Sequence, residues 1–217
     1  GDNGGDRGGS KPDPSKLPKV NGPCPELKDG STVEVGGAKV VLAVGSKPGP
    51  VYLYFHGTGT LPAEVELGIP GAVKSVRSNG GLVASWDTSN GKGLNTGTIW
   101  YTGDIDAADQ LIACAMEKNL VDTSRIHVAG YSAGGLETAS FVIKRAHYVA
   151  SAIVYSGGRP LFLLDALPKN LPSVVGAPGA PGADWLALDF GTMTPQFTAE
   201  VVKAGGPTVK NVSGFDL

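Results

Sequence analysis

Residues 125–136 of the chain, RIHVAGYSAGGL, decide its fold. Arg125 to Gly130 is typical of a buried strand, and Ala133 to Arg145 has the pattern of a helix. Between them lies G-x-S-x-G, which is typical of a sharp turn that raises its serine above the edge of a sheet. The start of the helix also favours negative charge that develops beside that serine. We therefore predict that Ser132 is a nucleophile; a tight turn around a buried serine is the structural alternative.

An earlier apolar run, residues 50–55 (PVYLYF), is also typical of a buried strand and ends at His56-Gly57-Thr58-Gly59. In hydrolases with a nucleophile turn of this kind, the loop after such a strand supplies a backbone N–H to the oxyanion hole. We expect the N–H groups of Thr58 and Ala133 to bind the oxyanion of a tetrahedral intermediate, each contributing about 3 kcal/mol. The side chain of His56 is expected to fix the loop.

The rest of the chain alternates strand and helix patterns. Gly36 and Gly37 separate two β-branched runs and predict an antiparallel hairpin. Thr194 is expected to cap the last helix, with Pro195 as its first residue. The predicted strands are 31–35, 38–44, 50–55, 81–86, 125–130, 151–155, 171–176 and 207–212, and the predicted helices are 62–79 with an interruption at 68–71, 104–119, 133–145 and 194–204. This order predicts a three-layer α/β/α sandwich around a mostly parallel sheet.

Four segments between Tyr52 and Gly158 resemble one enzyme family. They are YFHGTG, DIDAADQLIACA, RIHVAGYSAGGL and SAIVYSGG, and they look like the polyhydroxybutyrate-depolymerase and feruloyl-esterase branch of the α/β-hydrolases. The resemblance covers about half of the chain. It implies the α/β-hydrolase fold and cofactor-free hydrolysis of polyester or aryl-ester substrates, by a nucleophile, an acid and a histidine in that chain order. The family's nucleophile maps to Ser132 and its oxyanion donors to Ala133 and Thr58.

The acid is expected in the loop after the next-but-one strand that follows the nucleophile. Asp184 lies in such a loop, where a carboxylate could hold the imidazole of the catalytic histidine in the correct tautomer. Asp189 and Asp165 are alternatives, the first farther along the chain and the second ahead of the strand. Asp184 could instead cap a helix that begins at Trp185.

The histidine departs from the family pattern, because His56, His127 and His147 all precede the expected acid. His127 lies five residues before Ser132 in the same strand, roughly 16 Å away. His147 follows the next helix, about 20 Å away. We expect the catalytic histidine beyond Leu217 or on a separate C-terminal fragment, so that this chain alone is nearly inactive. The alternative is a catalytically inactive α/β-hydrolase-fold protein that binds, for example, a polymer surface.

The substrate site is expected to be open, because only about fifteen residues separate the strand ending at Tyr155 from the next one. A segment of this length is too short for a helical cap domain, and an open site suits bulky or polymeric esters. Tyr131 and Trp185 are the expected apolar contacts with substrate. Trp86 and Trp100 are expected to belong to the core instead.

Composition narrows the range of functions further. The chain has 217 residues, of which 41% are hydrophobic and 18% charged, and a formal net charge of −2. This length can bury a substantial core, and the scattered Lys and Arg residues offer no basic surface for nucleic acid. No apolar run approaches the ~20 residues of a membrane span. Composition thus gives no support for a nucleic-acid or membrane-spanning partner, and the partner that the family resemblance implies is an ester or polyester substrate.

The N-terminal residues 1–22 are rich in Gly, Pro, Asp and Lys, a composition that predicts a flexible tether. The hydrolase domain is expected to follow at 23–217 and to lack its C-terminal histidine segment. Tethers of this kind often follow an export signal, so an extracytoplasmic location is expected; a frayed terminus is the alternative. Cys24 and Cys114 fit no metal-binding spacing, and no metal is expected. Whether the two cysteines pair is left open.

Overall fold

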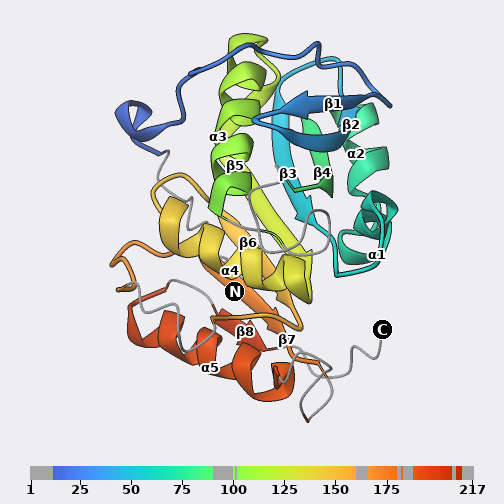
Figure 1. The fold of residues 1–217 in the computed structure, drawn as a ribbon. Helices are drawn as coiled ribbons and strands as arrows, with labels where there is room; N and C mark the ends of the chain where they lie inside the picture. The colour runs from blue at the N-terminus through green and yellow to red at the C-terminus, as the bar shows by residue number, and fades with distance from the viewer. Residues whose placement is uncertain are drawn as a thin grey trace, which may run out of the picture.

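Eight strands form one sheet in the computed structural model, which describes residues 12–89, 100, 102–159, 166–179, 182, 188–206 and 209–211 (Figure 1). The strands are β1 (Thr32–Val35), β2 (Ala38–Val44), β3 (Gly49–Phe55), β4 (Leu82–Thr88), β5 (Val121–Tyr131), β6 (Ser151–Tyr155), β7 (Ser173–Ala177) and β8 (Val209–Asn211). Their order across the sheet is β1-β2-β4-β3-β5-β6-β7-β8. The N-terminal hairpin β1–β2 joins β4 in antiparallel fashion, and every pair from β4–β3 to β7–β8 is parallel.

The register brings the ends of the central strands to one edge. Phe55 of β3 is opposite Gly130 of β5, and Tyr131 of β5 is opposite Tyr155 of β6. Because the strands are parallel, the segments that follow β3, β5 and β6 leave the sheet side by side. This is the edge at which open α/β sheets bind their ligands.

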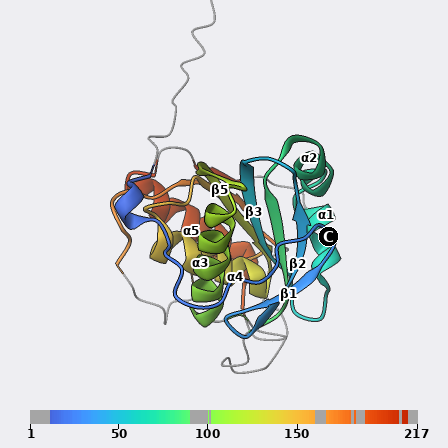
Figure 2. The same ribbon diagram turned by 90° about the horizontal axis from the view of Figure 1, so that it is seen from above.

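Helices cover both faces of the sheet, as Figure 2 shows: α3, α4 and α5 lie on one side and α1 and α2 on the other. The helical elements are η1 (Pro14–Lys16), η2 (Pro62–Glu64), α1 (Val65–Gly68), α2 (Ala72–Asn79), α3 (Thr102–Glu117), α4 (Ala133–Arg145) and α5 (Phe190–Lys203). This arrangement confirms the predicted three-layer sandwich with its mostly parallel sheet.

The larger core lies between the sheet and α3, α4 and α5, with a smaller cluster under α1 and α2. Phe55 is fully buried in the larger core, with its ring centroid 4.7 Å from that of Trp86 and 5.6 Å from that of Trp100. Trp86 and Trp100 are core residues, as expected. Tyr54, the neighbour of Phe55, points into the smaller cluster because side chains alternate along a strand.

Helix α5 begins earlier than predicted, so the expected cap at Thr194 is wrong. The helix starts at Phe190 with Asp189 as its N-cap, whose carboxylate accepts hydrogen bonds from the backbone N–H and the hydroxyl of Thr192. Thr194 is fully buried, and its hydroxyl donates to the carbonyl of Gly157 at 2.6 Å. Pro195 therefore lies inside the helix rather than at its first position.

The N-terminal segment is attached to α3. A disulfide joins Cys24 to Cys114, and the side chain of Gln110 accepts from the N–H of Asn21 and donates to the carbonyl of Gly22. Figure 1 shows this segment, in blue, crossing α3 before it enters β1. Within the described part of the chain, no helix is long and apolar enough to cross a membrane.

Candidate active site

Ser132 occupies the single residue between β5 and α4. Its backbone angles are φ 53° and ψ −115°, a strained conformation for a residue with a side chain. Its N–H donates to the carbonyl of Tyr155 at 2.9 Å, and its own carbonyl accepts from Leu136 as the helix begins. Its side chain makes no capping hydrogen bond to the helix, although serine is a common cap. Ser132 is partly exposed, and its hydroxyl is not used to cap the helix.

The glycines around Ser132 allow backbone segments to touch. A Cβ on Gly134 would lie 1.7 Å from the carbonyl oxygen of Phe55, and one on Gly130 would lie 2.3 Å from the carbonyl oxygen of Gly134. A Cβ on Gly135 would lie 2.5 Å from the carbonyl oxygen of Tyr155. Backbone cannot move aside cheaply, so these three positions admit only glycine. The contacts explain the G-x-S-x-G spacing, because they press the start of α4 onto the ends of β3 and β6.

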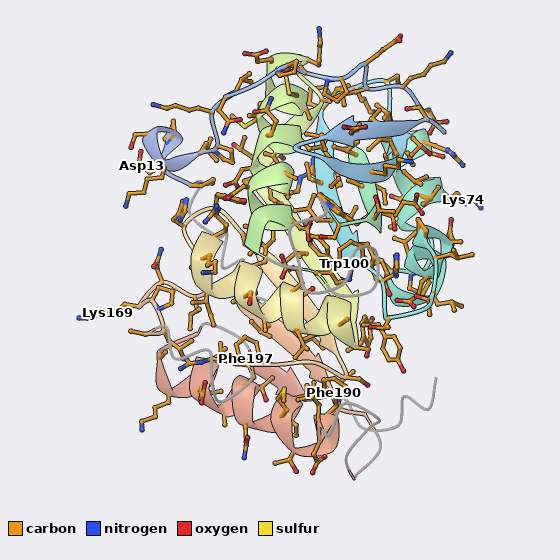
Figure 3. All side chains as sticks on the ribbon, in the orientation of Figure 1. Asp13, Lys74, Trp100, Lys169, Phe190 and Phe197 are labelled. Carbon is orange, nitrogen blue, oxygen red and sulfur yellow. A yellow bond between two sulfur atoms is a disulfide. The ribbon has the colours of Figure 1, made fainter. Side chains whose placement is uncertain are left out.

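The loop after β3 lies against this turn. A Cβ on Gly57 would lie 2.7 Å from Cδ1 of Tyr131 and 3.4 Å from its carbonyl oxygen. The indole N–H of Trp100, labelled in Figure 3, donates to the carbonyl of His56 at 2.8 Å. The structure thus brings the Thr58 loop beside the segment that carries Tyr131, Ser132 and Ala133.

Glu64 also fixes the Thr58 loop, and no sequence pattern pointed to it. Its carboxylate accepts from the backbone N–H of Gly57, the hydroxyl of Tyr54 and the hydroxyl of Thr60. An acidic residue near the start of a helix is common, so nothing in the sequence distinguishes Glu64 from Glu66.

Each of the chain's three histidines has a structural contact. His56 is 2% exposed, and its Nδ1 lies 2.7 Å from the carbonyl of Gly57, so the ring contributes to holding the loop. His127 stacks on Tyr52 with ring centroids 5.2 Å apart, and burial lowers its pKa. The ring of His147 packs edge-on against that of Tyr148, beyond the far end of α4.

The expected acid Asp184 and the expected contact Trp185 lie outside the described residues, as does the alternative Asp165. The other alternative, Asp189, lies within the described residues, and its carboxylate already has hydrogen-bond partners. Its hydrogen bonds with Thr192 lower its pKa, and the backbone N–H of Gly182 lowers it further. Asp189 thus accepts from the N–H of Gly182 and caps α5, which are structural tasks.

A pair of buried carboxyl groups lies between α3 and α4. Asp104 is fully buried and accepts from the hydroxyl of Ser89 at 2.7 Å, and Glu137 is 4% exposed. Burial, followed by the nearby Asp104, raises the pKa of Glu137 well above its ordinary value, while Lys144 opposes the shift. In the described part of the chain, Oε1 of Glu137 has no hydrogen-bond partner. No pattern in the sequence indicates that these two carboxyl groups lie near each other.

The described side chains include no group of three or more His, Cys, Asp or Glu residues that could hold a metal ion. The arrangement around Ser132 instead consists of a hydroxyl, backbone N–H groups and a helix N-terminus. These are the components with which proteins stabilise an oxyanion.

Comparisons with known proteins find likeness in structure but not in sequence. No family model and no curated protein matches the chain in sequence. An acetyl xylan esterase from Aspergillus awamori matches with a TM-score of 0.55 and 15% identity, over 78% of this chain and 76% of that chain. A bacterial heroin esterase matches with a TM-score of 0.58 and 19% identity, over 87% and 76%.

A third solved structure is a fluorophosphonate-binding serine hydrolase of Staphylococcus aureus, FphF. It matches with a TM-score of 0.56 and 12% identity, over 82% of this chain and 84% of that chain. Together with the strand order and the sharp turn after β5, these likenesses show that the chain has the α/β-hydrolase fold.

Proposed function

We propose that the protein is a serine ester hydrolase in which Ser132 is the nucleophile. The observation that carries the proposal is the backbone of Ser132, held at φ 53° between glycine contacts that admit no side chain. Maintaining such a conformation costs of order 1–3 kcal/mol, and strained residues of this kind cluster at catalytic sites. A protein that only bound a polymer would have no chemical need of it. This argument favours an enzyme over the inactive binding protein.

In the proposed reaction, Oγ of Ser132 attacks the carbonyl carbon of the ester and its proton passes to a histidine. The N–H groups of Thr58 and Ala133 stabilise the oxyanion that forms. The C–O bond of the ester then breaks, the leaving alcohol takes the proton from the histidine, and an acyl-enzyme remains. Water attacks the acyl-enzyme by the same route and releases the acid.

The histidine of this reaction is proposed to come from beyond Leu217 or from another polypeptide, since the rings of His56, His127 and His147 are engaged elsewhere. Asp184 is proposed to orient it. Without that base the serine remains a neutral alcohol, so residues 1–217 alone should turn over esters very slowly.

The proposed substrates are polyesters or bulky aryl and aliphatic esters. The support is the sequence resemblance to polyhydroxybutyrate depolymerases and feruloyl esterases, and the short connection from β6 to β7, which leaves no room for a cap domain. Two of the structural neighbours are described as esterases, of acetyl xylan and of heroin. Tyr131 and Trp185 are the proposed substrate contacts. The disulfide between Cys24 and Cys114 supports an oxidising, extracytoplasmic location.

The test is labelling by a fluorophosphonate together with turnover of p-nitrophenyl esters, in the protein that carries this chain and its histidine. Ser132→Ala is expected to abolish both, because it removes the hydroxyl that is proposed to form the acyl-enzyme. Ser140→Ala is the matched control, since Ser140 lies about two turns farther along α4. Undiminished turnover in Ser132→Ala would remove the serine from the mechanism and leave the binding protein as the better description.

A further inference from the structure

The peptide group between Gly57 and Thr58 is held from its carbonyl side. The carbonyl oxygen of Gly57 accepts from the backbone N–H of Thr60 at 3.1 Å and lies 2.7 Å from Nδ1 of His56 and 3.0 Å from the hydroxyl of Thr60. In a trans peptide the N–H points away from the C=O. The contacts on this carbonyl therefore set the direction of the Thr58 N–H, the proposed oxyanion donor.

The preceding peptide group is held by Glu64. The N–H of Gly57 donates to the Glu64 carboxylate, at 3.2 Å to Oε1 and 3.4 Å to Oε2. The hydroxyl of Thr60 donates to Oε2 of Glu64 at 2.5 Å and its backbone N–H donates to the carbonyl of Gly57, so Thr60 links Glu64 to that carbonyl. Glycine has the freest backbone of any residue. With both of its flanking peptide groups bonded, Gly57 loses that freedom.

Glu64 is in turn anchored to the sheet. The hydroxyl of Tyr54 donates to Oε1 of Glu64 at 2.8 Å, and the ring of Tyr54 is 1% exposed beneath α1. Burial and the charge of Glu64 raise the pKa of Tyr54, so its hydroxyl stays protonated as a donor. Tyr54 in β3 pairs with Ala129 in β5, the strand that ends at the Ser132 turn. The Thr58 loop and Ser132 are thus both anchored to β3 and β5.

We propose that Glu64 is a positioning residue, whose carboxylate sets the orientation of the Thr58 N–H relative to Ser132. The inference rests on the proposed ester hydrolysis and adds to it a residue that touches neither the substrate nor the reacting atoms. An oxyanion donor acts mainly in the transition state, so displacing it lowers kcat and leaves KM nearly unchanged.

The main test compares Glu64→Ala with Glu66→Ala in the protein that carries this chain and its histidine. Glu66 is exposed on the same turn and is the matched control. Glu64→Ala should lower kcat by about 10- to 100-fold, part of the loss seen when an oxyanion donor is deleted, with KM within about twofold. Inhibition by a trifluoromethyl ketone, which mimics the tetrahedral intermediate, should weaken in parallel. Glu64→Gln keeps one acceptor oxygen and should recover part of kcat.

Thr60→Val and Thr60→Ser give an independent reading if Glu64→Ala fails to fold. Valine removes the hydroxyl that donates to Glu64 and should lower kcat, whereas serine keeps that hydroxyl and should keep kcat near the parent value. Equal kcat in Glu64→Ala and Glu66→Ala, or a rise in KM alone, would overturn the role of Glu64. Loss of activity in Ser132→Ala with no kcat effect at Glu64 or Thr60 would reject only the positioning role. Retained activity in Ser132→Ala would reject the proposed function itself.

Discussion

At the residue scale, the protonation of Glu137 should change the free energy of unfolding of the protein. Because burial raises its pKa in the folded state above the ordinary value of 4.5, the folded protein binds more protons than the unfolded chain above that pH. The free energy of unfolding should therefore fall as pH rises from about 4.5 through the folded pKa, by up to about 1.4 kcal/mol per pH unit from this group.

The measurement is urea unfolding between pH 4 and pH 9. Glu137→Gln removes the titrating group and should flatten the pH dependence, whereas Glu117→Gln, an exposed change on α3, should leave it as in the parent. Asp104 and Lys144 face Glu137, so their own titration persists in both variants. A parent and a Glu137→Gln variant with the same pH dependence would contradict the shifted pKa.

At the residue scale, the sequence was informative where function depends on neighbours along the chain. Ser132 and its glycines lie within five consecutive residues, so their pattern predicted the turn. Glu64 and Glu137 depend on contacts between segments: Glu64 meets Tyr54 of the sheet, and Glu137 on α4 meets Asp104 on α3. Their neighbours along the chain say nothing of these partners.

At the scale of elements, two acidic residues after β7 can be tested for different roles. Asp189 caps α5, and Asp184 is proposed to orient the catalytic histidine. Asp189→Asn should keep both the fold and turnover, because asparagine caps a helix as well as aspartate does. Asp189→Ala should cost about 1 kcal/mol of stability and keep turnover. Asp184→Asn should fold normally and lose turnover on the order of 10⁴-fold, because the catalytic histidine would lose its orienting carboxylate.

Turnover and thermal unfolding of these three variants and of Asp165→Asn are the measurements. A large loss of turnover in Asp189→Asn, together with an active Asp184→Asn, would transfer the role of the acid to Asp189. A large loss in Asp165→Asn alone would transfer it to the segment before β7 instead.

The elements themselves were largely predictable, and the misses have physical causes. The bounds of β6 and α4 match the prediction. β5 begins earlier than predicted because Val121 pairs with Gly49 of β3, ahead of the polar residues Asp122 to Ser124 and an irregularity in the register. The start of α5 was missed because Pro195 is typical of a first helical position, while here the cap at Asp189 begins the helix a turn and a half earlier.

At the scale of the whole molecule, a disulfide stabilises the fold, and the sequence alone leaves open whether its two cysteines pair. Pairing of Cys24 with Cys114 closes a loop across 90 positions of sequence. In the chain-entropy view, a loop of that length stabilises the fold by about 4.6 kcal/mol. Replacing both cysteines by alanine should therefore lower the urea midpoint strongly.

Thiol titration of the unreduced protein in denaturant checks the link directly. The two cysteines of this chain should give no titratable thiol before reduction and two after it. Two thiols before reduction would contradict the disulfide and weaken the argument for an extracytoplasmic location.

The attachment of the N-terminal segment to α3 also decides how the domain carries mechanical load. Tension applied to the chain ahead of Asn21 meets the hydrogen bonds to the Gln110 side chain and then the disulfide, before it can reach β1. The force passes into α3, which packs against the larger core, and β1 at the edge of the sheet is not peeled away. A protein pulled from this end would keep its hairpin paired and its Ser132 turn undisturbed.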